Sequence, residues 1–290
     1  MHRRAALLLL LASFATAASA QFLQTGPRLT IGFHPDARPF TYENESGKPI
    51  GYGIELCQQA VALAKDALGP GAADPEWVHV DPQNRLGLLR EGKIQLLCGE
   101  PITLAARKEA ALSIPVYPGN VGALLRADAP PALANALSAR LGAAPWSGKP
   151  GQDLLQSQVL AVVDGSPTQD ALASRLAQLQ VSAKVTPVKS YPDGVQAILD
   201  GKANVFFADR STLRAAVKAN PSFDQLKVIE RRLSLAPVAI ALPRGNEDAR
   251  LAIDRALSTI YRTPAFRALY TKWFGEPDAD TVAFFRQAAL

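Results

Sequence analysis

The chain has 290 residues, of which 48 % are hydrophobic and 20 % are charged. This composition excludes a disordered chain, and at about 100 to 200 residues per domain it predicts two domains with sizeable cores. The 31 Lys and Arg residues against 26 Asp and Glu residues give a net charge of +5. Because these charges form no run of one sign, the sequence gives no indication of a nucleic-acid partner.

The first twenty residues have the pattern of a secretory signal peptide. Two arginines precede an apolar run at 5–15, and residues 18–20 have the small A-x-A sequence typical of a cleavage site. The alternative is a transmembrane anchor, but the run is shorter than the roughly 20 residues that span a bilayer. We therefore predict cleavage after Ala20 and export of the protein.

From residue 29 onward, short apolar or β-branched runs alternate with segments of helical period. Apolar residues at three- and four-residue spacing predict a helix at 56–68, which Gly69 and Pro70 end. The alternation predicts an α/β fold with largely parallel sheets. The strand candidates are 29–33, 77–80, 94–98, 121–125, 160–163, 184–188, 205–208 and 238–242.

This pattern predicts two lobes joined by two chain crossings. The first lobe is expected to contain 21–122 and 237–276, because apolar helical stripes near the end of the chain return to the pattern of the first half. The second lobe is expected to contain 123–236. A tail at 277–290 follows, with a short helix around 282–286 whose role the sequence does not indicate.

The sequence predicts neither a metal site nor a cofactor. Its histidines are His2, His34 and His79, and the first leaves with the signal peptide. It contains no phosphate-binding glycine loop, no nucleophile elbow and no ordered catalytic triad.

Three junctions between a strand and a helix carry candidate binding groups. Arg107 lies in the first turn of a helix after one strand and could hold a carboxylate through its planar fork. Ser166 and Thr168 follow a second strand, where they either bind an anion or only cap a helix. Asp209 ends a third strand and could accept from an ammonium group. Parallel strands bind ligands at their carboxyl ends, so we expect one cleft.

Six short segments, taken in order, resemble a known family. The family is the family 3 extracellular solute-binding proteins, the periplasmic receptors of polar amino-acid ABC importers, and the nearest branch is the glutamate/aspartate one. The resemblance covers residues 28 to about 276. It implies a two-lobed periplasmic-binding-protein-like fold (type II), with parallel or mixed sheets flanked by helices and a ligand cleft between the lobes. The segments are 39–42 (PFTY), 51–57 (GYGIELC), 82–85 (PQNR), 92–99 (GKIQLLCG), 201–209 (GKANVFFAD) and 272–275 (KWFG).

The resemblance also implies roles for individual residues. It places Arg107 on the α-carboxylate of an amino acid and Asp209 on its α-ammonium group. Phe40 would pack on the ligand, Ser166 would belong to a loop that helps bind the carboxylate, and Arg85 would read a side-chain carboxylate. Thr103 resembles the threonine that precedes the carboxylate-binding arginine.

Several positions depart from the glutamate/aspartate branch. His34 stands where that branch has Arg, Glu100 and Pro82 stand where it has Ser, and Tyr191 stands where it has His. We therefore expect a specificity other than glutamate. Arg85 still offers a cation for an acidic side chain, but Glu100 would repel such a side chain or attract a basic or additional ammonium group. The alternative is that Glu100 faces solvent or pairs with an arginine such as Arg38.

These features predict a periplasmic, monomeric binding protein that captures a small polar amino acid, closes on it and delivers it to the membrane permease of an ABC importer. The alternative is an enzyme on the same fold that resembles cyclohexadienyl dehydratase, with Glu100 or Glu55 as the acid. A receptor's sensor lobe is a weaker alternative, because no membrane span or signalling segment follows.

The two cysteines, Cys57 and Cys98, are predicted to form a disulfide. An exported protein enters an oxidising compartment, and both residues are placed on the same side of the predicted sheet. The alternative is a pair of buried thiols that pack as small apolar side chains.

Overall fold

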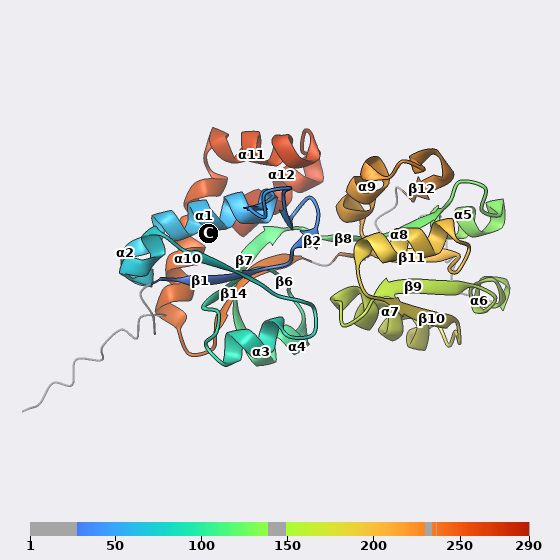
Figure 1. The fold of residues 1–290 in the computed structure, drawn as a ribbon, viewed down its shortest axis with the longest axis horizontal. Coiled ribbons are helices and arrows are strands. Elements are labelled where there is room, and N and C mark those ends of the chain that lie inside the picture. Colours follow the sequence, from blue (N-terminus) through green and yellow to red (C-terminus); the bar gives the residue numbers. More distant parts are fainter. Residues whose placement is uncertain (1–27, 139–148, 230–233, 236, 290) are drawn as a thin grey trace, which may run out of the picture.

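The computed structural model describes residues 28–138, 149–229, 234–235 and 237–289. The predicted signal peptide and its cleavage site lie outside these residues. Figure 1 shows two lobes side by side, each built on a sheet with helices on both faces. The α/β, two-lobed architecture predicted from the sequence is confirmed.

The first lobe contains a five-stranded mixed sheet in the order β5-β1-β6-β14-β7. Strand β1 pairs in parallel with β5 and β6, whereas β14 pairs antiparallel with β6 and β7. A strand from late in the chain thus lies between two strands from its first half. The strands are β1 (Thr30–Phe33), β5 (Glu76–His79), β6 (Leu96–Pro101), β7 (Ala110–Tyr117) and β14 (Val238–Pro243).

The second lobe contains the sheet β10-β9-β11-β8-β12, with β13 also paired to β8. Strands β10, β9 and β11 are parallel, and β8 is antiparallel to each of its partners. Both sheets are therefore mixed, and less parallel than the alternation of elements indicated. The strands are β8 (Asn120–Arg126), β9 (Val159–Val163), β10 (Lys184–Val188), β11 (Val205–Asp209), β12 (Leu226–Val228) and β13 (Ser234–Leu235).

Helices cover both faces of each sheet, and a small antiparallel sheet β2-β3-β4 joins the first lobe. Its strands are β2 (Asp36–Ala37), β3 (Thr41–Glu43) and β4 (Pro49–Ile50). The helices of the first lobe are α1 (Tyr52–Leu63), α2 (Lys65–Leu68), η1 (Pro70–Ala73), α3 (Arg85–Arg90), α4 (Leu104–Glu109), α10 (Glu247–Tyr261), α11 (Pro264–Phe274) and α12 (Ala279–Ala288). Those of the second are α5 (Pro131–Ser138), α6 (Lys149–Gln156), α7 (Pro167–Gln178), α8 (Tyr191–Leu199), α9 (Arg210–Ala219) and η2 (Phe223–Gln225).

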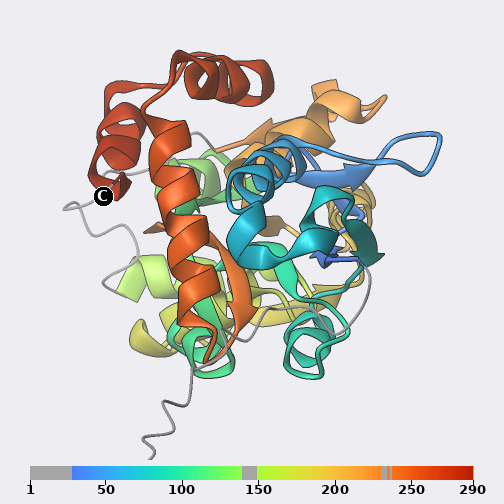
Figure 2. The ribbon, with the colours of Figure 1, turned by 90° about the vertical axis from the view of Figure 1, so that its left-hand side faces the viewer.

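Helix α1 begins four residues earlier than predicted. Gly51 precedes it and allows the helix to start in close contact with the backbone of Phe40. Gly51 has φ = 131°, and a Cβ there would collide with the carbonyl oxygen of Phe40. Tyr52, Leu56 and Ala60 then form a buried stripe at four-residue spacing, which packs beside α10. Figure 2 shows these two helices together on the outer face of the first lobe.

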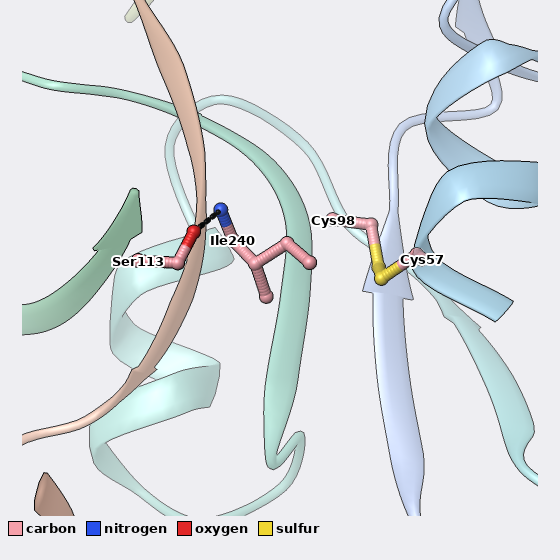
Figure 3. The surroundings of a disulfide bond; sticks show 4 residues. All are labelled: Cys57, Cys98, Ser113 and Ile240. Atoms are coloured by element: carbon pink, nitrogen blue, oxygen red, sulfur yellow. Dashed lines mark hydrogen bonds between the residues drawn. A yellow bond between two sulfur atoms is a disulfide. The ribbon is translucent and has the colours of Figure 1, made fainter. Parts of the chain in front are cut away.

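A disulfide joins Cys57 of α1 to Cys98 of β6, with their Cα atoms 6.2 Å apart. Both cysteines are buried within the core of the first lobe. Ile240 of β14 lies opposite Cys98 in the sheet, and its N–H donates to Ser113 Oγ at 2.9 Å (Figure 3). The disulfide therefore fixes a helix on the sheet close to the centre of that sheet.

The chain passes from the first sheet to the second between Tyr117 and Asn120, where β7 ends and β8 begins. It returns between Leu235 and Val238. Because all of β8 pairs within the second sheet, we propose that the second lobe begins at residue 120, slightly before the boundary predicted from the sequence. Helix α12 packs on the core of the first lobe through Phe285, and we propose that this part of the predicted tail belongs to that lobe.

Candidate functional site

A cavity of about 340 Å³ lies between the two lobes, and both lobes contribute to its lining. Most of its polar lining residues lie where a strand has just ended or a helix begins. His34 follows β1, Ser166 follows β9, and Asp209 is the last residue of β11. Arg85 and Tyr191 are the first residues of α3 and α8. The cavity therefore lies at the carboxyl ends of the parallel strands, where α/β proteins hold their ligands.

Eight of the ten predicted ligand-binding residues line this cavity. They are His34, Phe40, Arg85, Thr103, Ser166, Thr168, Tyr191 and Asp209. Glu100 does not line it but is paired with Arg85, which does. Arg107 is the residue that the structure does not bring to this site.

Arg107 is exposed on α4 and does not line the cavity. The reason lies in the cap of that helix. Thr103 is the N-cap, and its hydroxyl accepts from the backbone N–H of Ala106 at 3.0 Å. The helix thereby turns Ala106 into the core, 1 % exposed, and turns Arg107 to solvent. The structure does not support the carboxylate-binding role that the resemblance implied for Arg107.

Arg85 is the only Lys or Arg among the described residues that line the cavity. Its Nε donates to Glu100 Oε2 at 2.6 Å, its Nη2 donates to Glu100 Oε1 at 3.2 Å, and its Nη1 donates to the Pro82 carbonyl oxygen. These bonds use three of the five guanidinium N–H groups. Within the part of the chain that the structure describes, one N–H on each terminal nitrogen keeps no partner. That pair suits a carboxylate.

Glu100 lies on β6 and is 1 % exposed. Burial raises the pKa of its carboxyl, and the hydrogen bonds and charge of Arg85 oppose this shift. Glu100 therefore pairs with an arginine, which was the alternative expected from the sequence. The partner is Arg85 rather than Arg38.

Asp209 provides the acidic group on the opposite lobe, and it also caps α9. Its carboxylate accepts from the backbone N–H groups of Asn120 and Ser211 at 2.9 and 2.8 Å. Burial raises the pKa of this carboxyl to about 6, although the backbone donors pull it down. No other Asp or Glu among the described residues lines the cavity. Asp209 is therefore the group that could accept from an ammonium ion.

The N-terminus of α7 also faces the cavity. Ser166 caps this helix by accepting from the N–H of Gln169, and Pro167 and Thr168 form its first positions. The helix cap expected as one alternative is present, and Ser166, Pro167 and Thr168 also line the cavity. The helix dipole gives this end a partial positive charge, which favours an anion there.

Four aromatic side chains of the cavity lining form what we call the aromatic wall: Phe40, Tyr52, Tyr117 and Tyr191. The ring of Phe40 lies 4.6 Å from that of Tyr117 and 5.4 Å from that of Phe274, so packing fixes its position. Tyr191 contacts the ring of His34 across the lobes at 6.2 Å. His34 is in turn 2.6 Å from a carboxylate oxygen of Asp36.

Two further contacts join the lobes beside the cavity. Gln83 Nε2 donates to the backbone oxygen of Asp164 at 3.1 Å and to its carboxylate at 3.3 Å. The hydroxyls of Tyr117 and Ser211 lie 2.7 Å apart. Gln83 and Tyr117 are site residues that the sequence pattern did not indicate. Gln83 lies within the 82–85 motif, but only its neighbour Arg85 was singled out, and Tyr117 ends a strand that was not predicted.

The described residues contain no group of three or more His, Cys, Asp or Glu side chains that could hold a metal ion. Within the same residues, no helix is both long and apolar enough to cross a membrane.

The fold and this cleft define a two-lobed solute-binding protein. Residues 29–276 match the family model of the bacterial extracellular solute-binding proteins, family 3. The match spans most of the chain, and the protein therefore belongs to this family, as the resemblance predicted.

The chain is similar to several amino-acid-binding proteins whose names differ in the ligand. The L-glutamate/L-aspartate-binding protein of Pseudomonas aeruginosa is 21 % identical over 251 residues, which are 86 % of this chain and 77 % of that protein. An ancestral arginine-binding protein bound to arginine has a TM-score of 0.69 at 22 % identity, covering 87 % of this chain and all of that one. The ancestral amino-acid-binding protein AncCDT-1, a precursor of cyclohexadienyl dehydratase, has a TM-score of 0.67 at 21 % identity, covering 86 % and 95 %.

Proposed function

We propose that this protein captures a free α-amino acid between its lobes and delivers it to the permease of an ABC importer. One observation carries the proposal: Arg85 on the first lobe and Asp209 on the second line the same cavity. A zwitterion needs partners for both of its charges. Its carboxylate would bind the two free N–H groups of Arg85 near the N-terminus of α7, and its ammonium group would bind Asp209.

This assignment explains why binding would close the lobes. The two charges of the ligand are bound best when both lobes contact it, so the ligand favours the closed arrangement by its differential contacts. The contacts of Gln83 with Asp164 and of Tyr117 with Ser211 join the two lobes in the arrangement that the structure describes, and we expect the Gln83 contact to stabilise it. Export through cleavage after Ala20, a periplasmic location and a monomeric state complete the proposal.

An enzyme related to cyclohexadienyl dehydratase is the second candidate, and AncCDT-1 is the observation in its favour. The two carboxyl groups considered as its acid are both engaged with cations. Glu100 accepts two hydrogen bonds from Arg85, and Glu55 Oε1 lies 2.6 Å from Lys272 Nζ. Turnover of prephenate or arogenate by the purified protein would establish the enzyme.

Calorimetry with the twenty amino acids tests the binding function. We expect Arg85→Gln and Asp209→Asn each to weaken binding of the preferred amino acid by at least ~30-fold, because losing one partner of a desolvated charge pair costs ~2 to 5 kcal/mol. Arg107→Ala is the matched control and should change the affinity by less than about threefold, since Arg107 is exposed. Wild-type affinity in both cavity variants would contradict the proposed site.

A further inference from the structure

The Arg85–Glu100 pair has a consequence for the kind of amino acid that fits. The two side chains share a two-pronged hydrogen bond with distances of 2.6 and 3.2 Å, and their exposed fractions are 14 % and 1 %. Glu100 therefore compensates the charge of the one Lys or Arg that lines the cavity among the described residues. The Arg85–Glu100 pair therefore has no net positive charge, but it still offers hydrogen-bond donors to a ligand.

An acidic amino acid would bring two carboxylates to this cavity. The two remaining N–H groups of Arg85 can hold one of them. The second would be buried without a Lys or Arg partner, with only the partial positive charge at the N-terminus of α7 to meet it, and a buried charge without a full opposite charge is unfavourable.

A basic amino acid meets the opposite shortage. It carries two cations, whereas Asp209 is the only acidic side chain that lines the cavity within the described residues. Asp209 already has backbone N–H groups on both carboxylate oxygens, which leaves it room for one ammonium group. Once the two charges of the amino-acid backbone are bound, a charged side chain of either sign would find no further Lys, Arg, Asp or Glu among the described residues that line the cavity.

The remaining lining matches an apolar side chain. The aromatic wall is joined by the aliphatic side chains of Val80, Leu97, Ile102 and Val121, which come from both lobes. A cavity of about 340 Å³ has room for a bulky side chain, and sites of this size are usually apolar with a few polar groups that orient the ligand.

From these observations we infer that the ligand is an α-amino acid with an uncharged, bulky apolar side chain. Glu100 is the specificity-determining residue, which excludes acidic amino acids by compensating the charge of Arg85. This inference rests on the proposed function, since it assumes that an amino acid binds in this cavity.

The ranking of ligands by the wild-type protein is the first test. Calorimetry should give leucine, methionine or phenylalanine an affinity at least 30-fold higher than that of glutamate, aspartate, arginine or lysine. If a charged amino acid binds most tightly, the inference is overturned while the proposed function stands. If none of the twenty amino acids binds, the proposed function fails and the inference fails with it.

The second test is Glu100→Gln, which keeps the shape of the side chain and removes its charge. The ratio of the affinity for glutamate to that for the preferred uncharged amino acid should rise by about tenfold, because glutamate carries a net negative charge and the other ligand carries none. Glu109→Gln is the matched control, because Glu109 pairs with Arg90 at 2.9 Å at the surface, and it should leave the ratio unchanged. An unchanged ratio in Glu100→Gln, or an equal change in the control, overturns the role of Glu100. Should Glu100→Gln not fold, the wild-type ranking still decides the ligand class.

Discussion

Asp209 caps a helix and faces a ligand cavity at the same time, and its protonation links the two roles to pH. Burial raises the pKa of its carboxyl to about 6. In the protein without ligand, Asp209 is therefore mostly neutral below that pH and mostly ionised above it. The ammonium group of an amino acid is bound by the ionised form.

The affinity for the amino acid should consequently fall as the pH drops through about 6. Below that pH the loss should approach about tenfold per pH unit, because each binding event then has to release one proton. Above pH 7 the affinity should be nearly constant. Calorimetry from pH 4.5 to 8 on the wild-type protein and on Asp209→Asn measures this, and the same pH profile in both proteins would contradict the assignment.

Site residues at the ends of predicted strands could be predicted from the sequence, because the carboxyl ends of parallel strands lie at the same edge of the sheet. Asp209 and Ser166 were found in this way. The pairing of Arg85 with Glu100 was not, because it depends on how α3 lies against β6. The orientation of Arg107 was missed for a similar reason, since one turn of helix after the Thr103 cap decides which side chain faces the core.

At the scale of elements, the disulfide holds α1 on β6 across a separation of 41 residues. A loop of this length, opened in the unfolded chain by reduction, corresponds to a loss of stability of about 4 kcal/mol in the chain-entropy model. We expect a reducing buffer to lower the free energy of unfolding, measured with urea, by about this amount. The double variant Cys57→Ala, Cys98→Ala should show no sensitivity to the reductant, and equal midpoints for the wild-type protein with and without reductant would contradict the prediction.

Helix α12 contributes one buried aromatic side chain, that of Phe285, to the core of the first lobe. Phe285 is 5 % exposed, and its ring lies 4.7 Å from that of Phe266 and 5.1 Å from that of Tyr261. Phe285→Ala should therefore lower the free energy of unfolding by about 3 to 5 kcal/mol. Phe223 is 61 % exposed, so Phe223→Ala should change it by about 0.5 kcal/mol or less. Denaturant unfolding measures the free energy of unfolding of both variants. Similar values would show that α12 contributes little to the stability of the first lobe.

The pattern of apolar residues predicted eight of the strands, but not the order in which the strands pair. All eight predicted strands are present within small shifts. Strand β7 was missed because its sequence, Ala110–Tyr117, follows directly on a short helix and contains a proline. The mixed character of both sheets was also not evident, since the direction of a strand depends on partners that lie far away in the chain.

At the scale of the whole molecule, Gln83 and Asp164 form a bridge between the lobes. Gly165 beside it has φ = 66°, and a Cβ at that position would lie 3.1 Å from the side chain of Gln83. Glycine thus serves here both for the turn and for the close approach of the other lobe.

Gln83→Ala should weaken ligand binding by about two- to fivefold, because an exposed hydrogen-bonded contact contributes about 0.5 to 1 kcal/mol to the closed arrangement. Gln196→Ala removes a similar surface contact, with Asp200 at 2.6 Å inside one lobe, and should leave the affinity unchanged. Calorimetry gives both affinities. Equal affinities in the two variants would mean that the bridge does not favour closure.

The place of β14 in the first sheet has a consequence for biosynthesis. Strand β14 hydrogen-bonds to β6 on one side and β7 on the other, yet its residues follow the whole second lobe in the chain. While the ribosome is still synthesising the chain, the first sheet lacks a central strand until residue 243 has emerged. The first sheet therefore cannot be completed before the whole second lobe has been synthesised.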